Sequence, residues 1–209
     1  MNNFMSDKFN TDAEKASYGI GLQMGEQLKA TPFEGMNVNS VFEGMKDAFT
    51  GESFQVEIPE IQAAFEKINA EIQQRREEEA KVLAAEGEAF LADNAKRAEV
   101  TVTESGLQYE VIEQGEGDKP SADATVRTHY HGALINGTVF DSSYERGEPA
   151  EFPVGGVIKG WTEALQMMPT GSKWRLYVPH DLAYGERGAG AAIAPYSTLI
   201  FDIELIDIL

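Results

Sequence analysis

The sequence predicts an α+β protein with an all-helical N-terminal region, a long connecting helix and a C-terminal antiparallel sheet wrapped on one short helix. In the N-terminal half, apolar residues recur with helical spacing, whereas from Thr101 they alternate with polar residues, as in strands. Between these regions, the stretch from Pro59 to about Ala98 has no further proline and a single glycine, Gly87. The predicted boundaries are therefore 1–57, 58–100 and 101–209.

The composition excludes several classes of protein. The chain has 209 residues, of which 42% are hydrophobic, enough for one large domain or two ordinary ones. It has no cysteine, so disulfides and thiolate sites are excluded. The formal net charge of −18 would repel phosphate backbones, so we expect no nucleic-acid partner. Apolar runs are too short for a membrane span and the start does not resemble a secretory signal, so we expect a cytoplasmic protein.

Two short helices are predicted in the N-terminal region. Thr11 and Glu14 have the spacing of a capping box, and so do Ser40 and Glu43. The second helix has one apolar stripe and is expected to end at Gly51. The first helix has apolar residues around most of its circumference, at Tyr18, Ile20, Leu22, Met24 and Leu28.

The apolar surface of the first helix requires a cover on several sides. Two short helices cannot supply it, whereas a second copy of the chain can. Gly21 and Gly25 lie four residues apart and would let another backbone approach closely. We therefore expect a homodimer formed through the N-terminal helices, with a tight monomeric bundle as the alternative.

The connecting helix changes character along its length. Its first part has an apolar stripe, but the sequence QQRREEEAK that follows has no apolar face. A helix that is polar all round usually bridges two bodies through solvent, so we expect a second domain at its far end. A partly disordered charged linker is the alternative.

The C-terminal region is predicted to be mostly strands with one helix. Asn136 and Gly137 form a hairpin-turn signal, and Pro169 with Gly171 would stop the helix. The helix is expected at 157–168, where the apolar residues share one face. Strands are expected around 107–111, 126–134, 139–141, 173–178 and 198–209.

The usual catalytic groups are sparse. His129 and His131 flank Tyr130 on a predicted strand and would share the face opposite to it. No carboxylate stands at a recognisable metal-ligand spacing from them, so a solvent-facing strand is favoured over a metal site. The glycine-rich segment 185–190 is not followed by a helix and does not predict a phosphate site. We expect neither metal nor cofactor.

Aromatic residues are abundant in the C-terminal region and fall on different predicted elements. Tyr184 lies in a long loop, where a core residue is less expected. Asp141 directly follows Phe140, and Arg146 is five residues further on. An apolar pocket with a few polar groups would explain this pattern, and an ordinary aromatic core is the alternative. The aromatic residues are Tyr130, Phe140, Phe152, Trp161, Tyr184 and Phe201.

The segments GTVFDSS, VIKGW and LAYGERG resemble the FKBP family of peptidyl-prolyl cis–trans isomerases, and the resemblance covers nearly all of 101–209. The helical N-terminal half is similar to the Mip-like bacterial members, which are V-shaped homodimers, and to their signal-less cytoplasmic forms. The resemblance implies isomerisation of X–Pro bonds without a cofactor. It also implies proline-containing unfolded or flexible clients, and inhibition by macrolides of the FK506 and rapamycin type.

The resemblance also implies the site residues. Trp161 would form the floor, while the Ile158 N–H and the Tyr184 hydroxyl would bind carbonyls of the ligand. Asp141 would lie beside the twisting amide with Arg146 near it. The walls would be Tyr130, Phe140, Phe152, Val157, Ile158 and Phe201, with Ile193 in the loop above. From the residues alone, a binding module or holdase chaperone, and a structural dimer whose pocket is only core, are the alternatives.

Overall fold

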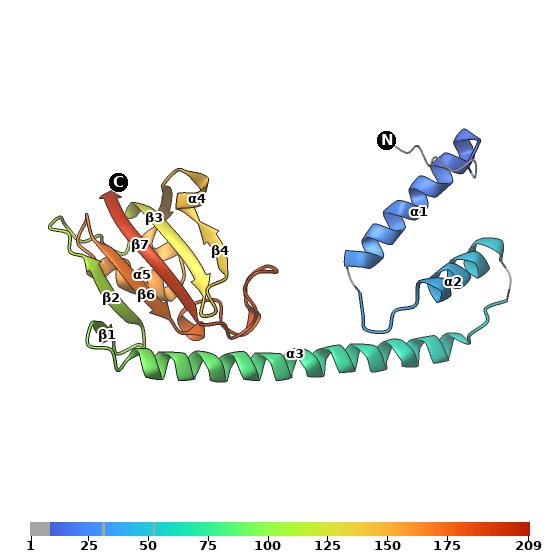
Figure 1. Cartoon of the computed structure of the whole chain (residues 1–209), viewed down its shortest axis with the longest axis horizontal. Helices are drawn as coiled ribbons and strands as arrows, with labels where there is room; N and C mark the ends of the chain where they lie inside the picture. Colours follow the sequence, from blue (N-terminus) through green and yellow to red (C-terminus); the bar gives the residue numbers. More distant parts are fainter. Residues whose placement is uncertain (1–8, 31, 52) are drawn as a thin grey trace, which may run out of the picture. The chain divides into compact units, whose positions relative to one another are not determined.

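The computed structural model describes residues 9–30, 32–51 and 53–209. The chain divides into two compact units, one ending at Gln74 and one beginning at Arg75 (Figure 1). The first is helical, and the second contains the end of the long helix and a sheet packed on one short helix, so the predicted α+β class is confirmed. Within the described ranges, none of the helices has the length and apolar character needed to cross a membrane.

The first helix, α1, runs over Asp12–Ala30. The predicted capping box is present at its start: the Thr11 hydroxyl accepts a hydrogen bond from the Glu14 N–H at 3.2 Å, and the Glu14 carboxylate accepts one from the Thr11 N–H at 2.9 Å. These two bonds satisfy N–H groups that lack partners in the first turn of a helix. The carboxylate hydrogen bonds also lower the pKa of Glu14.

The second helix, α2, runs over Val38–Thr50 and begins earlier than predicted. The Asn37 side chain accepts hydrogen bonds from the N–H groups of Asn39 and Ser40 at 2.9 and 3.2 Å. The predicted capping box of Ser40 and Glu43 is therefore wrong, because asparagine caps as well as serine and stands upstream. The predicted end is confirmed, since Gly51 takes a left-handed conformation with φ 71°.

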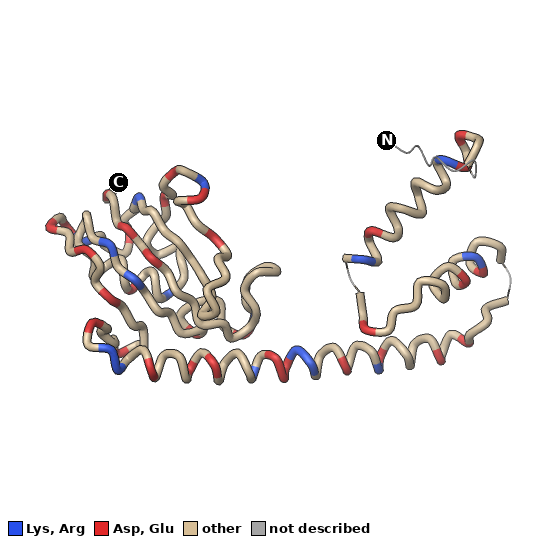
Figure 2. The backbone as a smooth tube through the Cα atoms, in the orientation of Figure 1, with Lys and Arg blue, Asp and Glu red and all other residues tan. Residues whose placement is uncertain are grey.

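The third helix, α3, is continuous over Ile58–Asn94. It ends at Asn94, before the predicted Ala98. Just beyond this end, the N–H groups of Lys96 and Arg97 donate to the carbonyls of Asp93 and Asn94, three residues earlier, as in a 3-10 turn. Figure 2 shows acidic and basic residues mixed along its middle, as the sequence indicates. The boundaries predicted at 57/58 and 100/101 stay predictions.

The C-terminal unit holds one seven-stranded antiparallel sheet. The strand order is β1-β2-β6-β7-β3-β4, and β5 pairs with β3. Strands β1 and β5 and the short helix α4 were not predicted, because elements this short show no periodicity. The bounds are β1 Val100–Val102, β2 Gln108–Glu113, β3 Thr125–Leu134, β4 Val139–Ser142, α4 Ser143–Arg146, β5 Ala150–Pro153, β6 Lys173–Val178 and β7 Leu199–Ile208.

One face of the sheet buries the main helix, α5, which runs over Lys159–Met167 (Figure 1). The predicted hairpin between β3 and β4 is present, and Gly137 there has φ 85°. The predicted helix start at 157 is two residues early, because Ile158 is the N-cap, with a ψ of 151° that is not helical. Val157 and Ile158 thus precede the helix, at the edge of the core. The fully buried core includes Leu107, Val126, Leu165, Met168, Leu176, Leu199 and Ile203.

Candidate functional site

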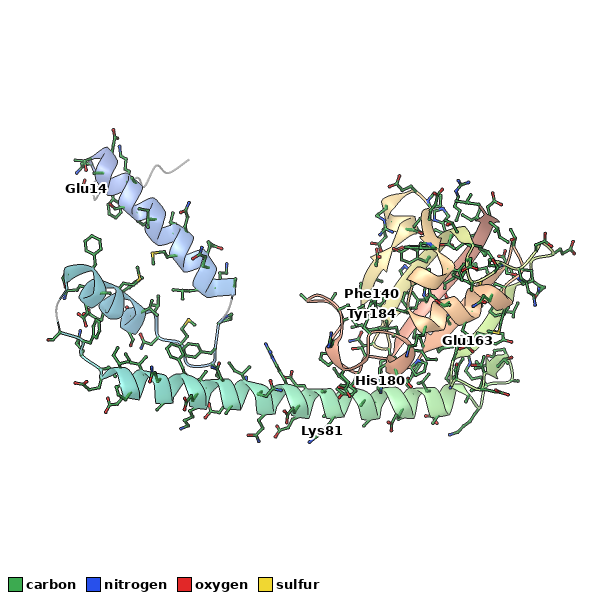
Figure 3. All side chains as sticks on the ribbon, turned by 180° about the vertical axis from the view of Figure 1, so that it is seen from behind. Glu14, Lys81, Phe140, Glu163, His180 and Tyr184 are labelled. Carbon is green, nitrogen blue, oxygen red and sulfur yellow. The ribbon has the colours of Figure 1, made fainter. Side chains whose placement is uncertain are left out.

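A cavity of about 670 Å³ opens at the N-terminal end of α5. Strands β3, β4, β5 and β7 contribute walls, and the loop between β6 and β7 contributes the remaining side. Figure 3 labels Phe140 and Tyr184, which reach the cavity from β4 and from that loop. The lining residues are Tyr130, Phe140, Asp141, Phe152, Gly156, Val157, Ile158, Trp161, Tyr184, Ala189, Gly190, Ala192, Ile193 and Phe201.

Trp161 forms the base of the cavity and is only 4% exposed. Aromatic rings of three strands meet the indole edge-on: its centroid is 5.3 Å from Tyr130, 5.6 Å from Phe152 and 5.2 Å from Phe201. Edge-to-face contacts of this kind are favourable beyond their buried area. The indole is therefore held rigidly in one orientation.

Two glycines make this aromatic arrangement fit. A Cβ at Gly132 on β3 would lie 2.7 Å from the Phe140 ring and 2.9 Å from the Phe201 ring. A Cβ at Gly160 on α5 would lie 2.6 Å from Val178. Any larger residue would have to displace a wall of the cavity or tilt the helix that carries its floor.

Three polar side chains form a closed network at the edge of the cavity. The Tyr130 hydroxyl donates to Asp141 Oδ2 at 2.5 Å, and Arg146 donates both to the other oxygen of Asp141 and to the Tyr130 hydroxyl, the latter at 2.8 Å. Arg146 stands on α4, whose start is capped by the Ser142 hydroxyl. The network fixes the Asp141 carboxylate beside the aromatic walls.

The same contacts keep the carboxylate ionised. Burial acts to raise the pKa of Asp141, but the hydrogen bonds from Tyr130 and Arg146 outweigh burial and hold the pKa below its usual value. Burial, followed by the hydrogen bond to Asp141, raises the pKa of the Tyr130 phenol. At neutral pH the cavity therefore has one fixed negative charge at its edge and a neutral phenol next to it.

Two donors are available to a bound molecule. The carbonyl of Ile158 accepts from the N–H groups of Trp161 and Thr162, both at 3.0 Å. The Ile158 N–H makes no hydrogen bond to any residue of the described ranges, as expected before the first turn of a helix. Tyr184 is 42% exposed and also lines the cavity. An N–H and a phenol thus face the same space.

The loop over the cavity is held by hydrogen bonds between its own residues. Ala189 and Ile193 exchange backbone hydrogen bonds at 2.8 and 3.1 Å, which turns the side chain of Ile193 inward, where it is buried. Gly188 has φ 64°, and a Cβ there would meet the Ile193 carbonyl oxygen at 2.1 Å. We call residues 179–198 the lid loop.

The two histidines of β3 are engaged outside the cavity. His129 Nδ1 lies 2.9 Å from the Ser143 hydroxyl, and its ring stacks on Tyr144. His131 Nδ1 lies 3.2 Å from the Ser142 hydroxyl. Among the described residues, no group of three or more His, Asp or Glu is arranged to hold a metal ion.

All predicted site residues except Arg146 line the cavity, and Arg146 contacts it through Asp141 and Tyr130. Sequence reasoning missed four small lining residues, Gly156, Ala189, Gly190 and Ala192. Small residues have no chemical signature, but their concentration in the lid loop could have indicated a surface that a ligand approaches closely.

Known proteins match the chain along both halves. The family described as FKBP-type peptidyl-prolyl cis-trans isomerase matches residues 116–206, and a domain amino terminal to such isomerases matches 13–111. The FKBP-type 22 kDa peptidyl-prolyl cis-trans isomerase of Escherichia coli is 52% identical over 96% of this chain and 98% of its own length. Outer membrane protein MIP of Legionella longbeachae is 42% identical over 95% and 86%.

Among solved structures, FkpA from Escherichia coli has a TM-score of 0.72 and 35% identity, covering 96% of this chain and 98% of FkpA. A peptidyl-prolyl cis-trans isomerase from Pseudomonas syringae has a TM-score of 0.58 and 40% identity, covering 62% of this chain and 95% of its own. With the aromatic cavity in place and both halves matched, the chain belongs to the FKBP-type peptidyl-prolyl cis-trans isomerases.

Proposed function

We propose that this isomerase twists X–Pro amides in the cavity above Trp161, and that it works as a homodimer on unfolded or flexible clients. The observation that carries the first part is the chemistry of the cavity lining. The residues that line it are aromatic, aliphatic or glycine, except for Asp141 at the edge, whose carboxylate is paired with Arg146 outside the lining. Such a site suits a reaction that makes and breaks no covalent bond.

Rotation about a peptide bond has a barrier of about 18–20 kcal/mol, because rotation breaks the amide resonance. For X–Pro bonds both isomers are populated, and uncatalysed exchange takes roughly tens to hundreds of seconds. The twisted amide is less charge-separated than the planar one, so an apolar cavity disfavours the ground state more than the transition state. A barrier lower by about 4–5 kcal/mol would accelerate exchange roughly a thousandfold or more.

Each predicted residue has a role in this scheme. The flat proline ring rests on the Trp161 indole, and the Ile158 N–H and Tyr184 hydroxyl bind the flanking carbonyls while the bond turns. Asp141 places its negative charge beside the amide that loses conjugation. Tyr130 and Arg146 hold that charge in place. Phe140, Phe152, Val157, Ile193 and Phe201 complete the wall that excludes water.

The test is catalysed cis–trans exchange of a short X–Pro peptide, followed by NMR magnetisation transfer. We expect Asp141→Asn to lower kcat/KM about tenfold or more, because removing one preorganised electrostatic contact has effects of that order. The matched control is Asp123→Asn, which removes an exposed carboxylate outside the cavity. Equal activities of the two variants would show that the charge at the cavity edge plays no part.

The homodimer is supported by the exposure of the N-terminal helices. No residue of α1 is buried, and Ile20 and Leu22 are more than half exposed. Such surface is expected to be covered by a second copy through the same helices. The mass in solution tests this directly: a dimer mass is expected at micromolar concentration, and a monomer mass would favour the tight bundle.

Client binding is supported by a second set of exposed residues, including Phe42 and Phe49 on α2. They favour a chaperone-like contribution, because apolar surface binds unfolded chains without requiring proline. Two sites held in one dimer would also raise the effective concentration of the client at the cavity. Removing the N-terminal unit should slow the refolding of a protein substrate, and unchanged refolding would exclude the client-binding part.

Two further expectations are proposals of the same kind. Macrolides of the FK506 and rapamycin type should bind in the cavity and change the fluorescence of Trp161, which a cavity serving only as core would not allow. The cytoplasmic location stays a prediction, and one relative is named an outer membrane protein. Fractionation of cells that produce the full chain would test it.

A further inference from the structure

Within the C-terminal unit, the last turns of α3 lie against the residue that precedes β7, and Gly87 is the point of closest approach. Gly87 is buried, and a Cβ at this position would lie 2.3 Å from Thr198 Oγ1 and 3.2 Å from Thr198 Cβ. Thr198 is itself only 4% exposed. Glycine in a helix interior costs about 1 kcal/mol relative to alanine. The close approach to Thr198 is a physical reason for having it there.

Thr198 stands where the lid loop joins β7. Its neighbour Ser197 donates a hydrogen bond from its hydroxyl to the Ala194 carbonyl at 2.7 Å. Ala194 follows Ile193, which lines the cavity and is bonded in both directions to Ala189. A short, internally bonded stretch of chain therefore connects the contact with α3 to a wall of the cavity.

Other contacts hold this part of α3 against the sheet. Asn94 donates to the Gln108 side chain at 2.9 Å, and Gln108 in turn donates to the Leu91 carbonyl at 2.9 Å. Arg97, just beyond the helix, donates to the Tyr177 hydroxyl at 2.8 Å. Because these bonds fix the end of the helix, added volume at Gly87 would displace Thr198 more readily than it would displace α3.

We propose that Gly87 is a positioning residue of the isomerase: it lets α3 lie against Thr198 and thereby holds the lid loop, with Ile193, in place over the cavity. This inference rests on the proposal that the cavity is the isomerase site. It makes the last turns of the connecting helix part of the catalytic domain. It also predicts that a change on α3, outside the cavity, alters substrate binding.

The test uses the full chain and the variant Gly87→Ala. The added methyl group should raise the KM for an X–Pro peptide about tenfold with kcat little changed, because a displaced wall weakens ground-state and transition-state binding alike. The amide hydrogens of Ala189 and Ile193 should exchange with solvent about tenfold faster, since their mutual bonds open more often. Melting temperature and circular dichroism should stay close to those of the parent.

Rescue separates positioning from a general loss of stability. The double variant Gly87→Ala/Thr198→Ala lacks the Oγ1 atom that the new methyl group would strike, so KM and amide exchange should return to within about twofold of Thr198→Ala alone. Gly44→Ala is the control for helix propensity, because an added Cβ there meets nothing within 4 Å. It should change neither quantity.

Three results would overturn the inference. One is an unchanged KM in Gly87→Ala, the second is unchanged exchange of Ile193, and the third is failure of the double variant to restore both. If exchange rises while KM does not, the lid does not govern substrate binding, and the inference fails. The Asp141→Asn comparison decides separately whether the cavity is the isomerase site. Should Gly87→Ala fold poorly, Thr198→Leu adds volume from the other side of the same contact and must raise KM in the same way.

Discussion

In the C-terminal unit Leu107, Val126 and Leu199 are fully buried, whereas in the N-terminal unit Phe49 is 94% exposed. Among the described residues up to Gln74, Asp47 alone is buried. Both units have amphipathic elements, but among the described residues the apolar face of the sheet is buried, whereas no apolar side chain of α1 or α2 is. We therefore expect the C-terminal unit to be stable by itself, and the proposed homodimer would give the N-terminal unit the cover that its exposed apolar residues lack.

Trp161 belongs both to the hydrophobic core of the C-terminal unit and to its cavity, so replacing it should lower stability and activity most. Trp161→Ala should lower the free energy of unfolding by about 3–5 kcal/mol, because it leaves a cavity among Tyr130, Phe152 and Phe201. Isomerase activity should fall at least as steeply. Denaturant unfolding and peptide exchange measure the two. Trp174→Ala, which removes a buried indole outside the cavity, is the control: it should cost stability but spare activity in the protein that remains folded.

A second prediction locates the N-terminal boundary of the C-terminal unit by truncation. A chain starting at Arg75 keeps the contacts of Gly87 and Asn94 with the sheet, so we expect peptide activity within about twofold of the full chain. A chain starting at Thr101 loses them and should unfold with roughly 2–4 kcal/mol less free energy, from lost apolar burial. Thermal unfolding of both chains checks this. Equal stability would place the boundary at 101, as predicted from the sequence.

The third effect tests the dependence of the N-terminal unit on a partner. Ile20→Asp on α1 should weaken the dimer by about 2 kcal/mol or more, roughly thirtyfold in Kd, because it places a charge in a surface proposed to be covered. Sedimentation across a dilution series measures it, with peptide activity unchanged. Lys15→Asp adds more negative charge to the same helix but removes no apolar surface, and should leave the dimer intact. If both variants dissociate, the loss of the dimer is explained by repulsion between negative charges and not by the loss of an apolar contact.

The same contrast explains how much the sequence could predict. The sequence placed β3 within a few residues, because its alternation reflects burial of one face within the chain. It placed α3 through the lack of proline and glycine over a long stretch rather than through burial, since Gly87 and Asn94 are the buried residues of that helix. The start of α2 was missed because several residues could cap it, and Asn37, which stands upstream of Ser40, makes the capping bonds. The resemblance gave the large cavity residues. Gly87 and Thr198 are far apart in the sequence and both are small, so no sequence pattern predicts their contact.

The smallest effect concerns the polar network of the C-terminal unit. Tyr130→Phe removes the hydrogen bond to Asp141, one of the contacts that lower its pKa, so the pKa of Asp141 should rise. A carboxyl whose folded-state pKa is lowered supports the fold above its unfolded pKa of about 3.9, and this support is lost as the pH falls through the folded value. The acid limb of activity should therefore move to higher pH in the variant, while activity at neutral pH falls only several-fold.

A pH profile of kcat/KM from acid to neutral pH measures this shift. Because the carboxylate is partly exposed, we expect a loss of stability of only about 1 kcal/mol or less. Tyr109→Phe is the control, since Tyr109 stacks on Trp174 outside the cavity. An acid limb that moves to lower pH, or moves equally in the control, would mean that Tyr130 does not hold the charge of Asp141. The Asp141 carboxylate would then owe its position to Arg146 alone, and Arg146→Leu should produce the shift that Tyr130→Phe did not.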